Sequence, residues 1–436
     1  MRVLVVGGGG REHALCWALR RDAASAFADD LILFAAPGNP GTATLGTNLP
    51  IAATAVDDLV AAVQQHDIDL TIVGPEAALA AGLTDRLRAA NRAVFGPSVA
   101  AARLESSKAY AKEVMRRAGV ATAASATFVN MGPALEYIAG QPEPLVVKAS
   151  GLAAGKGAVV CHTRIEAATV ARAMLEGALG EAGKEIVVEQ FLEGEELSVL
   201  ALTDSERIVI LPPAQDHKRL GEDDTGPNTG GMGAYTPVGI ATDALLARVR
   251  TEVFEPVLRE VAAQGAAYEG ILYAGLMIQP DGTPAVLEFN ARFGDPEAQA
   301  LLPALLPGFS EHLVAIAQRQ WNPLASQQVL AVERAAVTTV LAARGYPDNP
   351  EKGVAIRLPG PDELGDNVIV FHAGTYQDNE GRLRTSGGRV LSVTGLGATV
   401  AAAATASRAA AERIAFEGRT WRRDVAWREI QRAGAA

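Results

Sequence analysis

The chain has 436 residues, of which 49% are hydrophobic and 20% charged, a balance typical of a globular protein with a sizeable core. Its 50 acidic residues outnumber its 39 basic ones, and the net charge of −11 disfavours nucleic acid as a partner. The start, MRVLVVGGGG, holds too short an apolar run for a signal peptide, and no stretch approaches the roughly 18 apolar residues of a membrane span. Cys16 and Cys161 lie apart in apolar patterns, so we expect buried thiols, no disulfide framework and a cytoplasmic location.

Residues 1–104 repeat a pattern of apolar strand, loop and helix. Runs typical of strands begin at residues 2, 31, 69 and 93, and each leads through a glycine-containing loop toward a helical stretch. Strands that alternate with helices predict a parallel, doubly wound sheet, in which ligands bind at the carboxyl ends of the strands. The loops at that edge are GGGGRE, PGNPG, GPE and GPS.

A dinucleotide-binding domain is the first alternative for this region, and two observations disfavour it. The motif G-x-G-x-x-G requires glycine at positions 7, 9 and 12, but position 12 is Glu12. The second strand ends in FAAPG, with no acidic residue for a ribose hydroxyl. A nicotinamide-dependent oxidoreductase is therefore disfavoured.

Four short strands (ATFV, PLVVKAS, AVVCHT and EIVVEQFL) around one helix, at 164–179, predict a mobile α+β lid over about 122–192. Between its second and third strands lies KASGLAAGKGAVV, which is not a P-loop, because only three residues separate its first two glycines and a glycine follows the second lysine. Such a loop still offers backbone N–H groups to phosphates, although a flexible hairpin with a solvated lysine is the alternative. The candidates here are Lys148, Gly151, Gly155, Lys156 and Gly157.

The fourth lid strand runs through Phe191 and Leu192 into an EG turn and then into a further strand. The backbone of such a hinge can hydrogen-bond an adenine edge, and the nearby Glu196 can accept ribose hydroxyls. Acidic residues near a turn are more often solvated, so the hinge alone identifies no site.

The strand VLEFNARFGD carries the clearest chemical signal. Side chains alternate between the faces of a strand, so an acid, an amide and a guanidinium share one face, opposite an apolar face predicted to be core. Mg²⁺ prefers such carboxylate and amide oxygens, and an arginine can hold a carboxylate or phosphate bidentately. The alternative is a solvated face with a chance salt bridge. The polar residues are Glu288, Asn290 and Arg292, with Asp295 and Glu297 following; the apolar ones are Leu287, Phe289 and Ala291.

Residues 216–235, DHKRLGEDDTGPNTGGMGAY, contain five glycines and six charged residues and are typical of a mobile or functional loop. One helix is predicted over 243–264, followed by strands GILYAGLMIQ and PAVLEFNARFG. From about residue 326, strands with turn signals predict a β-rich C-terminal domain with a last helix through AERIAFEG.

Four features follow one another along the chain: the lysine strand, the glycine loop, the hinge and the E-x-N strand. This order resembles the ATP-grasp superfamily, in which two lobes grip ATP and a carboxylate is activated as an acyl phosphate. More narrowly, VVGGGGREHAL, GPEAAL, DHKR with DTGPNTGGMGAY, and EFNARFGDPE resemble the phosphoribosylamine–glycine ligase family. The likeness continues through TSGGRVLSVTGLG and WRRDVAWREI, so it covers nearly the whole chain.

The resemblance implies an α/β domain over 1–104, an ATP-grasp domain over 105–325 and a β-rich domain over 326–436. It implies that ATP, glycine and 5-phosphoribosylamine give ADP, phosphate and glycinamide ribonucleotide, with Mg²⁺ or Mn²⁺ and with no nucleic acid or membrane partner. We expect a monomer or weak dimer. Another ATP-grasp carboxylate–amine ligase or carboxylase, and a non-catalytic nucleotide sensor, are the alternatives.

The resemblance also implies roles for single residues. The metal would rest on Glu288 and Asn290 alone, because the position thirteen residues earlier, where many relatives carry a third acid, is Gly275. Lys108, Lys148 and Lys156 would balance phosphate charge. The adenine would meet the backbone of Glu189 and Leu192, and the ribose Glu196.

For glycine and the transfer centre, the implied residues are Asp216, Lys218, Arg292 and Asp295. The phosphate of phosphoribosylamine would meet Gly8, Gly9 and Gly10 at a helix N-terminus, and Glu76 would reach a sugar hydroxyl. No general base is evident, and His217 is expected to be structural.

Overall fold

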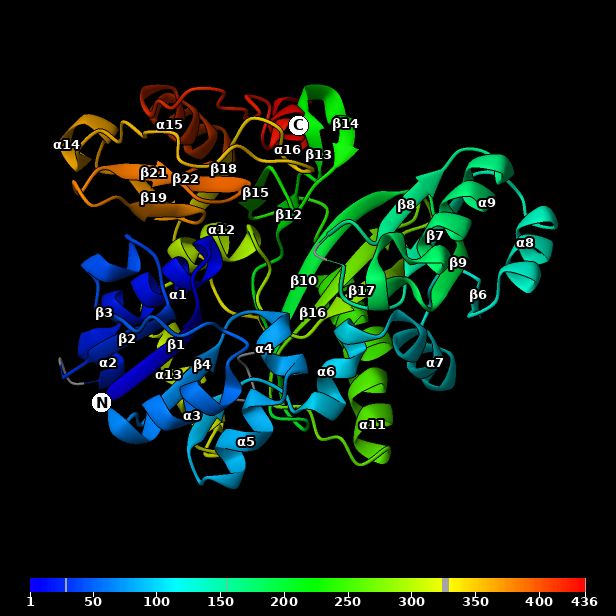
Figure 1. The fold of residues 1–436 in the computed structure, drawn as a ribbon, viewed down its shortest axis with the longest axis horizontal. Helices are drawn as coiled ribbons and strands as arrows, with labels where there is room; N and C mark the ends of the chain where they lie inside the picture. Colours follow the sequence, from blue (N-terminus) through cyan, green and yellow to red (C-terminus); the bar gives the residue numbers. More distant parts are fainter. Residues whose placement is uncertain (28–29, 154, 324–328, 436) are drawn as a thin grey trace.

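The computed structural model describes residues 1–27, 30–153, 155–323 and 329–435. In Figure 1 the N-terminal lobe (blue), the C-terminal lobe (orange and red) and a projecting lid (cyan to green) surround a central sheet. The predicted boundary between residues 325 and 326 lies outside the described residues. Within the described ranges, no helix combines the length and apolar character that a membrane crossing requires.

The N-terminal lobe is built on the predicted parallel sheet, with strand order β3-β2-β1-β4-β5. Helices flank the sheet, so β1 is apolar and buried from Val3 to Val6. The order reverses between β1 and β4, where ligands bind in doubly wound sheets, and the loops that follow these two strands carry the glycine turn and Glu76. The elements are β1 (Arg2–Gly7), α1 (Gly10–Arg21), β2 (Ile32–Pro37), β3 (Thr47–Asn48), α3 (Val56–Gln65), β4 (Leu70–Val73), α4 (Glu76–Ala80), α5 (Leu83–Ala89) and β5 (Ala93–Phe95).

The central sheet is antiparallel, with order β11-β10-β16-β17, and is apolar on both faces. One face packs with α7 and α11, and the other shares a core with the N-terminal sheet and α13. The helix predicted over 243–264 is observed as α10 and α11, joined by a π-helical turn. The elements are α6 (Val99–Ser106), α7 (Lys108–Ala118), β10 (Glu195–Thr203), β11 (Ile208–Ile210), α10 (Asp243–Arg248), α11 (Glu255–Ala263), β16 (Gly270–Ile278), β17 (Pro284–Asn290), α12 (Glu297–Ala304) and α13 (Phe309–Ala317).

The lid has its own four-stranded sheet, of order β6-β9-β7-β8, and its own hydrophobic cluster. Its four strands were predicted, but the structure adds a second helix, α8. The predicted helix over 164–179 is shorter, because α9 ends at Ala173 and the π-helical turn after it contains Gly177 in the left-handed region, with φ of 102°. The elements are β6 (Ser125–Phe128), α8 (Met131–Ala139), β7 (Leu145–Ala149), β8 (Ala158–Cys161), α9 (Arg164–Ala173) and β9 (Ile186–Gln190).

The C-terminal sheet, of order β12-β15-β18-β22-β19, is shared with an earlier part of the chain. Its first two strands come from 215–236, and a hairpin, β13–β14, lies between them, so the predicted glycine-rich loop is largely paired backbone. The elements are β12 (Gln215–Asp216), β13 (Arg219–Gly221), β14 (Thr225–Asn228), β15 (Gly233–Thr236), β18 (Ala335–Ala342), β19 (Val368–His372), β20 (Thr375–Gln377), β21 (Leu383–Thr385), β22 (Arg389–Gly397), α15 (Val400–Arg413) and α16 (Trp427–Ala435).

The predicted last helix, through 411–418, is wrong in its extent. α15 ends at Arg413, because the next residue, Ile414, is extended and Ala415 exchanges two backbone hydrogen bonds with Arg357. The final helix is α16, near the C-terminus. It lies beside the β13–β14 hairpin (Figure 1).

Candidate functional site

The main cavity, of about 450 Å³, lies between the lid, the central sheet and the N-terminal lobe. Most of the predicted site residues line it, and they come from the lid, the central sheet with its helices, the N-terminal lobe and strand β12 of the C-terminal sheet. They are Glu76, Lys108, Lys148, Gly155, Gly157, Glu189, Leu192, Glu196, Asp216, Lys218, Glu288, Asn290, Arg292 and Asp295.

The two predicted metal ligands, Glu288 and Asn290, lie at the end of β17 and line this cavity. Gly275 pairs directly with Glu288 across the sheet, so a third acid there would have been its neighbour. Burial alone would raise the pKa of Glu288, but Lys218, Lys148 and Lys108 outweigh it and hold that pKa below its usual value. An ionised carboxylate beside an amide oxygen fits Mg²⁺, which takes one or two protein ligands and completes its shell with phosphate and water.

The described residues contain no group of three or more His, Cys, Asp or Glu side chains arranged to hold a metal. A site on two protein oxygens agrees with this. The prediction that Leu287 joins the core is wrong: it is half-buried and belongs to no hydrophobic cluster of the described residues, because the register shifts beside it. The residue lines the cavity, and its carbonyl accepts a hydrogen bond from Lys148 Nζ at 2.9 Å.

Buried lysines form the wall opposite the metal strand. Lys148 pairs with Glu189, whose other oxygen lies 2.5 Å from Lys112 Nζ. Burial lowers the pKa of Lys112 despite Glu189, and it lowers the pKa of Lys108 despite Glu288. The Glu189 side chain therefore organises cations, a role that is separate from the backbone contact predicted for it.

The glycine loop joins β7 to β8, and only part of it faces the cavity. Gly155 has a φ of 79° and lines the cavity together with Gly157. Gly151 does not line it, and its N–H donates to the Ala182 carbonyl at 3.1 Å, so the structure does not present Gly151 as a phosphate donor. Lys156 also lies outside the lining, 3.6 Å from the Asp348 carboxylate.

Asp216 and Lys218 enter the cavity from β12 and the residues that follow it. Burial raises the pKa of Asp216 to about 8, with Glu297 adding to the effect and Lys218 opposing it. Lys218 Nζ lies 2.6 Å from Glu196, and its pKa is well above its usual value because the charges of Glu196 and Asp216 outweigh burial. This end of the cavity is rich in acids and suits a cationic ligand.

Arg292 is held by two carboxylates. Its Nη2 lies 2.8 Å from Glu105, which also accepts a hydrogen bond from the Ala291 N–H at 2.7 Å. Its Nε lies 3.4 Å from Glu76, the residue predicted to reach a sugar hydroxyl. Burial raises the pKa of Glu105, whereas these acids raise that of Arg292 against burial. The guanidinium is thus fixed at the cavity wall before any ligand binds.

A second cavity, of about 440 Å³, lies between the N-terminal and C-terminal lobes. Gly8 and Gly9 line it, but Gly10 lines neither cavity. The Gly9 N–H donates to Glu12 at 2.7 Å, so this helix N-terminus is less open to an anion than the sequence suggested. The two cavities share the Asp295–Arg389 pair, whose charged atoms are 2.7 Å apart. Burial would raise the pKa of Asp295, but Arg389, together with Arg11 and the hydrogen bond from Gln299, holds it below its usual value.

His217 is buried, and its Nε2 accepts the Ala426 N–H at 2.9 Å, in agreement with a structural histidine. Three residues that line the main cavity were not predicted from the sequence: Lys112, Glu105 and Arg389. Lys112 and Glu105 lie in ordinary helical patterns without a distinguishing signal. Arg389 stands in the quoted motif TSGGRVLSVTGLG, whose glycines could have drawn attention to it.

Comparison with known proteins agrees with this geometry. Models of the phosphoribosylglycinamide synthetase N domain, ATP-grasp (A) domain and C domain match residues 1–105, 106–298 and 336–428. A phosphoribosylamine–glycine ligase of Yersinia pestis is 46% identical over 435 residues, covering 99% of this chain and 100% of that protein.

Two solved structures are also similar. The crystal structure of a Thermotoga maritima phosphoribosylamine–glycine ligase has a TM-score of 0.84 and 35% identity, over 97% of this chain and 100% of that one. A Hydrogenobacter thermophilus 2-oxoglutarate carboxylase biotin carboxylase domain, solved with MgADP, has a TM-score of 0.70 at 16% identity, over 96% of this chain and 91% of that one, and shares the fold. The chain belongs to the phosphoribosylglycinamide synthetase family, and its function is that of a phosphoribosylamine–glycine ligase.

Proposed function

We propose that the two cavities together perform the family's reaction: glycine is ligated to 5-phosphoribosylamine, with ATP converted to ADP and phosphate, through glycyl phosphate. One observation carries the proposal. The main cavity brings buried lysines, the E-x-N strand, Arg292 and an acidic end together, and a second cavity adjoins it at Asp295 and Arg389. We place the enzyme in the cytoplasm, as a monomer or weak dimer, with domains over 1–104, 105–325 and 326–436.

ATP would lie between the lid and the central sheet. The backbone at Glu189 and Leu192 would hold adenine, and Glu196 the ribose. Lys148 and Lys108 line the same cavity and would neutralise the phosphates, with Lys156 joining if the glycine loop folds over them. Glu288 and Asn290 would hold Mg²⁺, which when bound neutralises phosphate charge as a Lewis acid. The MgADP complex of the distant carboxylase supports a nucleotide with a divalent ion in this fold.

Glycine would bind where the cavity is most acidic. Its ammonium would face Asp216, and that positive charge would lower the carboxyl pKa from about 8, so the residue would be ionised in the complex. Its carboxylate would face Arg292, already oriented by Glu105. Positioning and charge neutralisation let the carboxylate oxygen attack the γ-phosphorus, forming glycyl phosphate and releasing ADP.

Phosphoribosylamine would occupy the second cavity, with its phosphate near Gly8, Gly9 and Arg389. Its amine would approach the wall shared at Asp295, attack the glycyl carbonyl and release phosphate. An amine is already a good nucleophile toward an acyl phosphate, so little help from a general base is required.

ADP release tests the proposal, measured with glycine alone, phosphoribosylamine alone, and both. Full release should require both substrates, together with formation of glycinamide ribonucleotide. ADP release at the same rate with and without the two substrates would refute the ligase and favour another ATPase. Nucleotide binding without any turnover would favour the nucleotide sensor.

A further inference from the structure

Arg422, near the C-terminus, is the largest fully buried side chain in the described part of the chain, with 0% exposure. Its Nε and Nη2 donate to Asp424 at 2.8 and 2.6 Å. Its Nη1 donates to Asp224 at 2.8 Å and to the Arg219 carbonyl at 3.2 Å. One guanidinium thus joins residues 419–432, here called the C-terminal segment, to the β13–β14 hairpin.

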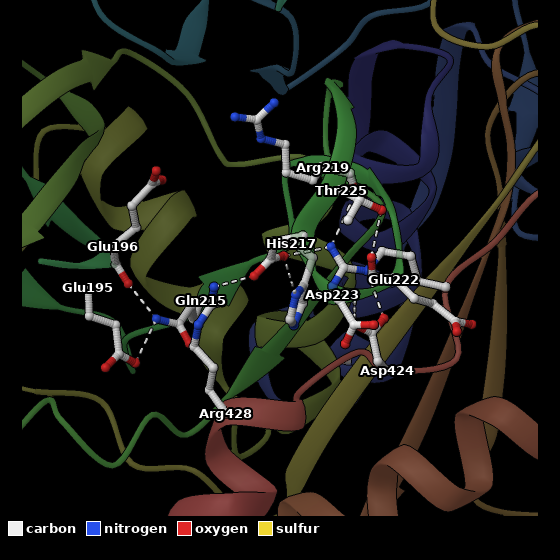
Figure 2. Close-up of polar contacts among 12 residues, drawn as sticks. Glu195, Glu196, Gln215, His217, Arg219, Glu222, Asp223, Thr225, Asp424 and Arg428 are labelled. Atoms are coloured by element: carbon white, nitrogen blue, oxygen red, sulfur yellow. Dashed lines mark hydrogen bonds and ion pairs between the residues drawn. The ribbon is translucent and has the colours of Figure 1, made fainter. Parts of the chain in front are cut away.

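Further contacts tie the same two regions together. The Asp223 N–H donates to Asp424 at 2.9 Å, and Arg428 pairs with Asp224. The Arg423 N–H donates to Glu222 at 3.1 Å. Figure 2 shows Glu222, Asp223 and Asp424 gathered on one side of His217.

His217 is the link from this network to the cavity. It stands between Asp216 and Lys218, which both line the cavity, whereas His217 itself does not line it and is 1% exposed. Its Nε2 accepts the N–H of Ala426, a buried residue in the left-handed region with φ of 69°. Side chains alternate along extended backbone, so fixing the imidazole fixes the direction of its two neighbours.

The imidazole suits this role chemically. Burial lowers the pKa of His217, so the ring is neutral near pH 7 and its Nε2 remains an acceptor. The proton is then on Nδ1, which lies 3.8 Å from Asp224. An apolar replacement would leave the Ala426 N–H buried without a hydrogen-bond acceptor. The backbone could remove this energetic cost only by moving the N–H to another acceptor or to water.

The network also reaches the strand that carries Glu196. Arg432 pairs with Glu195 at 2.9 Å, and the Gln215 side-chain amide donates to Glu195 at 3.0 Å and to the Glu196 carbonyl at 2.6 Å. Glu195, Glu196 and Gln215 lie together on the opposite side of His217 (Figure 2). The C-terminal segment therefore holds both strands from which this end of the cavity is built.

We propose that His217 is a positioning residue through which the C-terminal segment sets the location of Asp216 and Lys218 at the reacting centre. This inference rests on the proposed function, because it takes these two residues to bind glycine. Nothing in it requires His217 to touch a substrate.

The test compares His217→Leu with His217→Gln, whose amide oxygen can take the place of the Nε2 acceptor. Because displacements near 1 Å can cost about 100-fold in rate, we expect His217→Leu to lose about that factor in kcat/KM for glycine. The KM for glycine should rise while the KM for ATP stays within about 2-fold of wild type, and His217→Gln should recover most of the loss. His162→Leu, at an exposed histidine in the lid, is the matched control.

A role in stability alone would lower the active fraction and leave both KM values unchanged, and that result would overturn the inference. If His217→Leu does not fold, Arg428→Met decides, because it removes the ion pair with Asp224 and the contact of the guanidinium over the Trp427 ring, while the Ala426–His217 hydrogen bond keeps both its partners. We then expect a rise of about 3-fold or more in the KM for glycine, on the same positional argument, and an unchanged value overturns the inference. Asp216→Asn is measured in parallel: if it is fully active, the glycine site of the proposed function fails as well, whereas an inactive Asp216→Asn with a wild-type His217→Leu refutes the positioning role alone.

Discussion

Asp216→Asn should change the pH dependence of stability in the absence of ligands. The carboxyl has a pKa of about 8 in the folded protein, against 3.8 as its ordinary value. Because the folded state binds this proton more tightly, its contribution to stability is complete below pH 3.8 and is lost as pH rises toward 8. Asparagine has no proton to lose, so the variant should not share this decline.

The magnitude follows from the shift. Within that window each pH unit changes the free energy of unfolding by about 1.4 kcal/mol, which gives roughly 2 kcal/mol between pH 6 and pH 8 once half-titration at the upper end is included. Asp216 is half-buried beside the cavity, so water screens it and this value is an upper bound. For 436 residues, 2 kcal/mol corresponds to a shift of about 2 °C in Tm.

The assay is thermal unfolding of both proteins between about pH 6 and pH 8, where subtraction removes groups common to both. The Tm of Asp216→Asn minus that of wild type should become more positive as pH rises, by up to about 2 °C. This increase should shrink when glycine is bound, because its ammonium group lowers the carboxyl pKa. Asp58→Asn, at an exposed aspartate on α3, serves as the control. For Asp216→Asn, a value of this signed difference that stays constant or falls as pH rises would refute the raised pKa.

Three further substitutions test separate parts of the site. Glu288→Gln should lower kcat/KM at least about 100-fold, because it removes a metal ligand. In the same steady-state assay, Glu193→Gln at the exposed hinge should keep kcat/KM within about 2-fold of wild type. Equal effects of the two substitutions would contradict the metal assignment. Gly155→Val should weaken ATP binding, measured by calorimetry, more than it lowers Tm, because a φ of 79° is strained for a β-branched residue. An unchanged ATP affinity would count against the glycine loop as a phosphate cradle. Arg389→Met should raise the KM for phosphoribosylamine about 10-fold or more while the KM for ATP changes little, and the opposite split would assign Arg389 to the nucleotide.

Local patterns predicted much of the fold because the physics behind them is local. Alternation in the strand that carries Glu288 and Asn290 placed both at the cavity, and strands alternating with helices predicted the parallel N-terminal sheet. Leu287 does not follow this alternation, because the register shifts against β16 beside it. Such a shift is set by the partner strand and cannot be recognised in the sequence of β17 itself.

Contacts between residues that lie far apart along the chain could not be predicted from the sequence. Segment 216–235 has the composition of a free loop, yet β15 pairs with β18, about a hundred positions later in the chain. The sequence gives no sign that Arg292 has an acidic partner, but in the structure Glu105, from a helix far earlier in the chain, lies 2.8 Å from its guanidinium. Residue types and local spacing carry no information on such partners.

The central claim is that Glu288 and Asn290 together hold a divalent ion beneath the phosphates of a nucleotide in the main cavity. A crystal structure with ADP and Mg²⁺ tests it most directly. We expect an ion about 2.1 Å from one oxygen of each residue and bound to the diphosphate, with Lys148 and Lys108 beside the phosphates. Nucleotide bound outside this cavity, or an ion that both side chains leave uncoordinated, would contradict it.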